Sequence, residues 1–291
     1  MDPYTRKELA FRAAARAEQV RLKCDVAIAS PVDSLLVTEK RKCEVRFMAL
    51  PSLEGVYSPP PRPVMILGSQ RPAGRRAFTC AHELGHHEFM HGTRMEEIDS
   101  VRSKRQEDPE EFLADMFAAF LLMSQGSVRR AFKDRNLQPH KVEPMEVFRL
   151  ACYFGVGYGT LISHLTWTLK LMSQLQREVL LQTQPRELKA EFGGAPQSEV
   201  ILVDGLWQHR CVDLEIGDTL VLHPGVVVEE GPRLSAQGSM DGQPIFKAVS
   251  RGYIRAFHKQ DGWAVNIRIS SKHYQGLARY RFLDDPEESI Q

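Results

Sequence analysis

Two histidines and a glutamate stand at a spacing that suits metal chemistry in the run His82-Glu83-Leu84-Gly85-His86. If the run is helical, the two histidines lie one turn apart on one face, where two imidazoles can hold a zinc ion at about 2.0–2.1 Å. Glu83 falls about 100° around the helix, off the line of the ligands. Zinc can lower the pKa of a bound water to about 7, and Glu83 can accept the proton. The pattern predicts a hydrolytic zinc site with His82 and His86 as ligands and Glu83 as catalytic base.

The third ligand has to come from elsewhere in the chain. Metzincins place a glycine three residues and a histidine six residues after the second motif histidine, but this chain has Phe89 and Gly92 there. A glutamate from a second helix is the alternative. Glu111 opens an apolar helical run and Asp115 follows one turn later on the same face, so we expect Glu111 to be the ligand and Asp115 to orient a ligand histidine. Glu110, about 100° away around the helix, is the competing ligand and ranks behind Glu111.

Other side chains near the motif have roles that the sequence leaves open. His87 and His91 lie on other faces of the helix, and we expect them at the surface or as partners of the ligand histidines. Gly85 costs up to about 1 kcal/mol in a helix relative to alanine, but it would let a facing strand or helix approach closely. Stabilisation of the transition-state oxyanion has three candidates in the sequence, namely Tyr153, Tyr158 and His140.

Helices and strands that could position these residues follow from apolar periodicity and turn residues. Helices are predicted over residues 5–24, over 76–91 with Gly92 as the C-cap, and from Glu111 onward. Strands are predicted at Val45–Ala49 and Val64–Gly68. The intervening segments are predicted as a turn-rich run at 50–55, an extended proline-rich loop at 59–63 and, after the motif helix, a solvated loop or exposed helix at 94–110.

The second half of the chain changes from helical to β-type patterns. Residues 144–172 read as helix, glycine-containing turn and helix, and 183–199 as a linker. The second helix offers only His164 and Lys170 to base edges, so direct DNA binding is not expected. Beyond the linker, short β-type runs between turns predict a small all-β domain. These runs are 200–203, 219–222, 225–228, 245–249 and 263–267.

Composition and charge exclude several classes of protein. The 291 residues include 38 basic and 37 acidic side chains, and this balance argues against a globally basic nucleic-acid binder. The N-terminal residues lack the apolar region of a signal peptide, and no stretch approaches the 18 or so apolar residues of a membrane span. The five cysteines form no CxxC pair, and we expect them to be buried, reduced thiols in a cytoplasmic protein.

Two segments resemble the ImmA/IrrE family of metallopeptidases. Residues 75–86 are similar to the approach to that family's zinc helix, and residues 111–119 to its second signature. The similarity extends over about residues 5–172. The family usually has proline after the Leu-Leu-Met run that follows here, whereas this chain has Ser124, which we expect to alter only how the helix ends.

The resemblance implies a cytoplasmic endopeptidase whose substrate is a protein, with a helix-turn-helix transcriptional repressor as the expected substrate in a stress or mobile-element response. It implies an α+β fold with a zincin-like metallopeptidase domain and a helix-turn-helix-like region. The β-rich region lies outside the shared core, and we treat it as an accessory domain. We place these three domains at 1–125, 126–182 and 183–291. The substrate would be expected to pair as an extra strand along an edge strand near Val64–Leu67.

Two other classes of function compete with the peptidase hypothesis. A partner-binding regulator could keep zinc for structure without cleaving, but structural zinc needs no general base such as Glu83 beside an open coordination position. A DNA-binding regulator is disfavoured by the neutral charge and the apolar second helix. The sequence therefore favours a zinc endopeptidase with His82, His86 and Glu111 as metal ligands and Glu83 as its base.

Overall fold

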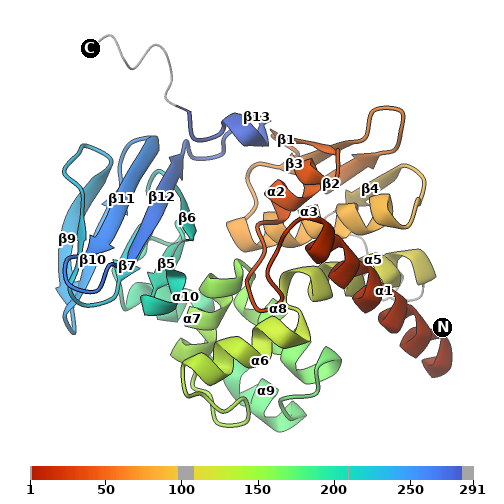
Figure 1. Ribbon diagram of the computed structural model, residues 1–291, viewed down its shortest axis with the longest axis horizontal. Helices are drawn as coiled ribbons and strands as arrows, with labels where there is room; N and C mark the ends of the chain where they lie inside the picture. The colour runs from red at the N-terminus through yellow and green to blue at the C-terminus, as the bar shows by residue number, and fades with distance from the viewer. Residues whose placement is uncertain (1, 98–107, 209, 284–291) are drawn as a thin grey trace. The chain divides into compact units, whose positions relative to one another are not determined.

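The chain forms two compact units in a computed structural model that describes residues 2–97, 108–208 and 210–283 (Figure 1). The mixture of helices with largely antiparallel sheets gives the α+β class that the sequence predicted. The domain boundaries at 125 and 182 stay a prediction. Unit 1 comprises Met1–Val142, Phe154–Gln174 and Gln275–Ala278, and unit 2 comprises Glu143–Tyr153, Leu175–Tyr274 and Arg279–Gln291.

The helices of unit 1 include the two that were expected to carry the metal site. The long N-terminal helix α1 begins after Asp2, whose carboxylate accepts hydrogen bonds from the N–H groups of Tyr4 and Thr5, as an N-cap should. Helix α5 begins in the same way after Asp108. The helices of unit 1 are α1 (Pro3–Lys23), α2 (Ser34–Lys40), α3 (Ala73–Glu88), α5 (Pro109–Leu122), α6 (Gln125–Asp134) and α8 (Tyr158–Ser163), which continues as the π-helical turn η1 (His164–Thr168).

The motif helix ends earlier than the sequence predicted. Helix α3 ends at Glu88 with Phe89 as its C-cap, and Met90 adopts the left-handed conformation with φ of 58°. The N–H of His91 then bonds to the carbonyl of His86 at 2.9 Å. The prediction that Gly92 caps this helix was wrong, because Met90 makes the left-handed turn two residues earlier.

The sheet of unit 1 has the strand order β13-β1-β3-β2-β4. Strands β1 and β3 are parallel, and the other pairs are antiparallel. Figure 1 shows β13, from the C-terminal end of the chain, beside β1. The strands are β1 (Glu44–Met48), β2 (Leu53–Ser58), β3 (Val64–Gly68), β4 (Arg94–Glu97) and β13 (Gly276–Leu277).

Two sequence-based expectations about this sheet were wrong. Strand β3 pairs with β1 on one side and β2 on the other, so Val64–Leu67 is interior and cannot accept a substrate as an edge strand. Strand β2 was assigned in part to a turn-rich run, because its start is rich in turn residues and interrupted by a bulge. The stretch 94–110, predicted as loop or exposed helix, begins with β4, and its residues 98–107 lie outside the described residues.

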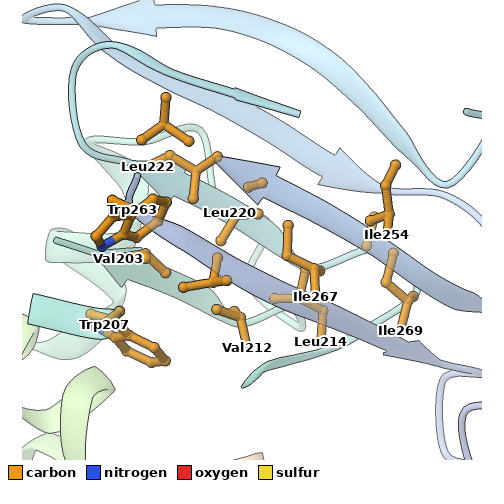
Figure 2. Close-up of a cluster of buried hydrophobic side chains, with 14 residues drawn as sticks. Val203, Trp207, Val212, Leu214, Leu220, Leu222, Ile254, Trp263, Ile267 and Ile269 are labelled. Carbon is orange, nitrogen blue, oxygen red and sulfur yellow. The ribbon is translucent and has the colours of Figure 1, made fainter. Parts of the chain in front are cut away.

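Unit 2 is built on two four-stranded sheets with orders β5-β7-β10-β9 and β6-β12-β11-β8. Figure 2 shows the cluster of apolar side chains in this unit, with Trp207, Trp263 and Ile267 among them. The strands are β5 (Val200–Val203), β6 (Cys211–Glu215), β7 (Thr219–Leu222), β8 (Val226–Val228), β9 (Leu234–Met240), β10 (Gln243–Ala248), β11 (Gly252–His258) and β12 (Ala264–Ser270). The described residues also form two 3-10 turns, η2 (Gly205–Trp207) and η3 (Ala278–Tyr280). The first residue of η3, Ala278, belongs to unit 1.

The segments around residues 144–199 differ partly from their prediction. The predicted helix-turn-helix corresponds to α7 (Pro144–Phe154) and α8, and the division between the units falls at Phe154. The predicted linker contains helix α10 (Pro185–Ala190), which follows α9 (Gln174–Gln182). Proline is tolerated at the first helical position because the N–H that it lacks would have no partner there. Pro185 is the first residue of α10, whereas the prediction had assigned it to the linker. None of the helices in the described ranges combines the length and hydropathy that a membrane crossing requires.

Candidate metal centre

The two motif histidines converge on one point on the buried face of α3. His82 is 2% exposed and His86 is fully buried. Their Nε2 atoms lie 3.0 Å apart, and their rings meet edge to face with centroids 4.7 Å apart. Because both histidines are neighbours on one helix face, the helix places the two side chains within reach of one another.

Helix α5 contributes a carboxylate to the same point. Glu111 stands in the first turn of α5, and its Oε2 lies 3.4 Å from the Nε2 of His82 while its Oε1 lies 3.5 Å from the Nε2 of His86. A tetrahedral site with bonds of about 2.1 Å has edges of about 3.4 Å between its ligand atoms. The three groups His82, His86 and Glu111, whose ligand atoms all lie within 4.8 Å of one another, therefore have the chemistry and the size that a metal ion needs.

Each histidine also has a partner on its other ring nitrogen. The Nδ1 of His82 lies 2.8 Å from Oδ1 of Asp115, one turn along α5 from Glu111. The Nδ1 of His86 lies 2.8 Å from Nδ1 of His91, just beyond the end of α3. When Nδ1–H donates to such a partner, the lone pair of Nε2 is left for a metal, so these contacts fix the tautomer that a ligand requires.

The close approach of α3 and α5 depends on a glycine. A Cβ added at Gly85 would lie 3.0 Å from the Cα of Ala114 and 3.2 Å from Cδ1 of Phe117. Gly85 was predicted to let a facing element approach closely. These contacts agree with that prediction and identify the facing element as α5. Ala114 was missed by the sequence analysis, although a small residue between Glu111 and Asp115 is the signal that could have indicated a helix contact there.

The remaining candidates have different surroundings. Glu83 is 1% exposed on α3. Tyr158, at the start of α8, is buried, and burial raises its pKa to about 12. His140 is exposed, and Tyr153 belongs to unit 2, where it packs edge to face on Trp207. Glu110 is absent from the His82–His86–Glu111 group found among the described residues. The roles assigned to these side chains in the sequence analysis stay predictions.

Comparison with known proteins identifies the region that contains this site. Residues 38–166 match the model of the peptidase M78 family, described as an IrrE N-terminal-like domain. This part of the chain belongs to the ImmA/IrrE family. The family assignment indicates a metallopeptidase-like protein with a protein substrate. The resemblance on which the sequence analysis relied is thereby confirmed.

Two other comparisons add nothing to the assignment. The chain matches none of the curated proteins. The crystal structure of the cysteine protease inhibitor EhICP2 from Entamoeba histolytica is similar over 26% of this chain and 99% of that one, with 11% identity and a TM-score of 0.20. A similarity at this level supports no argument about fold or function.

The ImmA/IrrE region spans both helices of the candidate site. It begins inside α2, so α1 precedes the matched residues, and it ends within η1. Ser124, which replaces the usual proline of the family, is the N-cap of α6, and its Oγ accepts a hydrogen bond from the N–H of Ser127 at 3.2 Å. The departure therefore lies between the end of α5 and the start of α6.

Proposed function

We propose that this protein is a zinc-dependent endopeptidase with a zincin-like catalytic domain, in which His82, His86 and Glu111 bind the metal and Glu83 is the general base. The observation that supports the proposal most strongly is the convergence of two imidazole Nε2 atoms and one carboxylate within 4.8 Å. Two histidines and a glutamate are a known donor set of catalytic zinc sites, which keep a further coordination position open.

The protein's own residues have distinct tasks in this proposal. Asp115 and His91 orient His82 and His86 through their Nδ1 atoms, so that both Nε2 lone pairs point toward the metal position. Zinc bound there would polarise a peptide carbonyl and lower the pKa of a coordinated water. Glu83 would accept the proton of the attacking water and pass it to the leaving amine, which balances the hydrolysis of the peptide bond.

We further propose that the substrate is a helix-turn-helix transcriptional repressor and that the protein acts in the cytoplasm in a stress or mobile-element response. This part of the proposal comes from the family to which residues 38–166 belong. We expect no direct DNA binding, because a DNA-reading helix needs arginine, lysine, asparagine or glutamine side chains, and residues 158–171 offer only Lys170 of these types.

Cleavage by the zinc-loaded protein and its Glu83→Gln variant tests the proposal. Both proteins are incubated with the repressor encoded nearest the gene, and the metal content of each is measured. Glutamine keeps the size of the side chain but cannot accept a proton, so cleavage should be abolished while zinc content stays unchanged. Cleavage by Glu83→Gln would contradict the mechanism. Binding of the repressor without cleavage by the wild-type protein would favour a zinc-containing regulator that binds its partner without cleaving it.

A further inference from the structure

One stripe of α3 faces strand β2 and contains the proposed base. Arg75, Thr79, Glu83 and His87 follow one another at intervals of four residues, so they lie along one face of the helix. This face differs from the one that carries the ligand histidines toward α5. Strand β2 therefore contacts Glu83, and α5 contacts the ligand histidines.

Both ends of this stripe are bonded to β2. Near the start of α3, Nε of Arg75 lies 2.9 Å from Oε2 of Glu54. Three turns later, Nδ1 of His87 lies 2.9 Å from the hydroxyl oxygen of Tyr57. Tyr57 is 1% exposed, and burial raises its pKa to about 12, so its hydroxyl keeps its proton at neutral pH.

The middle of the stripe presses against a glycine. A Cβ added at Gly55 would lie 2.7 Å from Cγ2 of Thr79 and 3.3 Å from Oε1 of Glu83. The first distance is too short for a real contact, and the second would push the carboxylate by a few tenths of an ångström. Gly55 is not among the residues with positive φ, so its backbone conformation does not require glycine. What requires glycine at this position is the space between β2 and the base.

A bulge in the pairing of β2 with β4 falls at Glu54, next to Gly55. The pairing of β2 with β4 matches Leu53 with Glu97 and Gly55 with Glu96, so Glu54 is the extra residue. Glu54 is 3% exposed and is held by Arg75 and, at 3.7 Å, by Arg71. Bulges change the direction of side chains and occur often beside active sites. The pairing of β2 with β3 keeps one register from Gly55 to Ser58, and Gly55 and Tyr57 both lie against α3.

We propose that β2 is a positioning element for Glu83, in which the Glu54–Arg75 ion pair and the Tyr57–His87 hydrogen bond hold Gly55 against the carboxylate and thereby set its position. Gly55, Glu54 and Tyr57 are positioning residues and not catalytic ones. This inference rests on the proposed function, since the role of Glu83 as base belongs to that proposal.

The contact between positions 55 and 83 can be tested without any substrate. All variants carry Thr79→Ser, which removes Cγ2 and with it the worst overlap, so that Gly55→Ala can fold. In this background, Gly55→Ala should lower the Tm by several degrees when Glu83 is present and by less than half as much when Glu83 is replaced by alanine. Gly92→Ala, where an added Cβ meets nothing within 4 Å, is the control and should leave the Tm unchanged. Equal Tm losses with and without Glu83 would overturn the inference.

The kinetic test separates positioning from packing. We expect Gly55→Ala with Thr79→Ser to lower kcat about tenfold relative to Thr79→Ser alone, because small displacements of catalytic groups are costly, while KM and zinc content stay the same. The repressor that the wild-type protein cleaves is the substrate. An unchanged kcat would overturn the inference and reduce Gly55 to a packing residue. If the wild-type protein cleaves nothing, the proposed function fails, and the Tm measurements still decide whether Gly55 holds Glu83.

Discussion

The interface of α3 and α5 buries two histidines between carboxylates, whereas the two sheets of unit 2 bury a cluster of aliphatic and tryptophan side chains. Ionisable groups are expensive to remove from water unless they are paired or bind a metal, while each buried aliphatic side chain contributes about 1.5–3 kcal/mol of stability. The first interior therefore places costly ionisable groups where a metal could bind, and the second buries apolar side chains that stabilise unit 2. This difference indicates where function lies in the molecule, and the following predictions test it.

The largest expected effect is the loss of metal affinity in Glu111→Ala. Structural zinc sites with four ligands bind with about 10–16 kcal/mol, which is on the order of 3–4 kcal/mol per ligand. The dissociation constant for zinc should therefore rise several hundred-fold, as measured by competition with a chromogenic chelator. The matched control is Glu110→Ala, one residue earlier on α5. If Glu110→Ala has the larger effect, Glu110 is the ligand.

The two units should respond to pH in opposite directions. In unit 1, burial lowers the pKa of His164 to about 4, although its Nε2 bonds to the carbonyl of Met123 at 2.8 Å. Because an unfolded histidine titrates near 6.5, unit 1 is fully stabilised above that pH and loses up to about 3 kcal/mol as the pH falls through 4. In unit 2, burial raises the pKa of Asp218 to about 6. Its contribution is fully present below the unfolded pKa of about 3.8 and is lost as the pH rises through 6.

Hydrogen exchange of α5 and β12 between pH 4.5 and 7 would measure the stability of the two units separately. Protection of α5, corrected for intrinsic exchange rates, should increase with pH, and that of β12 should decrease. The variants His164→Gln and Asp218→Asn should each flatten the pH dependence of their own unit. A parallel change in both units would contradict the prediction.

The smallest effect should come from the apolar cluster of unit 2. Ile267 is fully buried in the cluster of unit 2, and Ile267→Val should lower the free energy of unfolding by about 0.5–1.5 kcal/mol in urea titration. The zinc stoichiometry should stay the same, because this residue belongs to a different unit from the candidate site. If the variant lost zinc while it remained folded, the metal site of unit 1 would depend on the apolar cluster of unit 2, and the comparison would fail.

Features determined by neighbouring residues were predictable from the sequence. The helices that begin at Pro3 and Pro109 follow from their apolar periodicity, and the spacing of His82 and His86 fixes their common face. The four-residue spacing of Glu111 and Asp115 ranked Glu111 ahead of Glu110, and Glu111 is the one that lies near both histidines.

Features determined by distant contacts were not predictable. Strand β2 was missed because its bulge and its turn residues hide the alternation of a strand, and its pairing with β3 and β4 is a tertiary property. Strand β13 pairs with β1 across more than two hundred residues of sequence. The importance of Gly55 depends on the distance from β2 to Glu83, which no local pattern encodes.

Metal K-edge X-ray absorption of the zinc-reconstituted protein tests the central claim most directly, because it needs no substrate. With His82, His86 and Glu111 as ligands, the spectrum should fit two imidazole nitrogens at about 2.0–2.1 Å with oxygen donors at about 2.0–2.2 Å and no sulfur. The Glu111→Ala variant should lose the protein oxygen or the zinc itself. A sulfur shell at about 2.3 Å, or a protein that retains no zinc, would contradict the account.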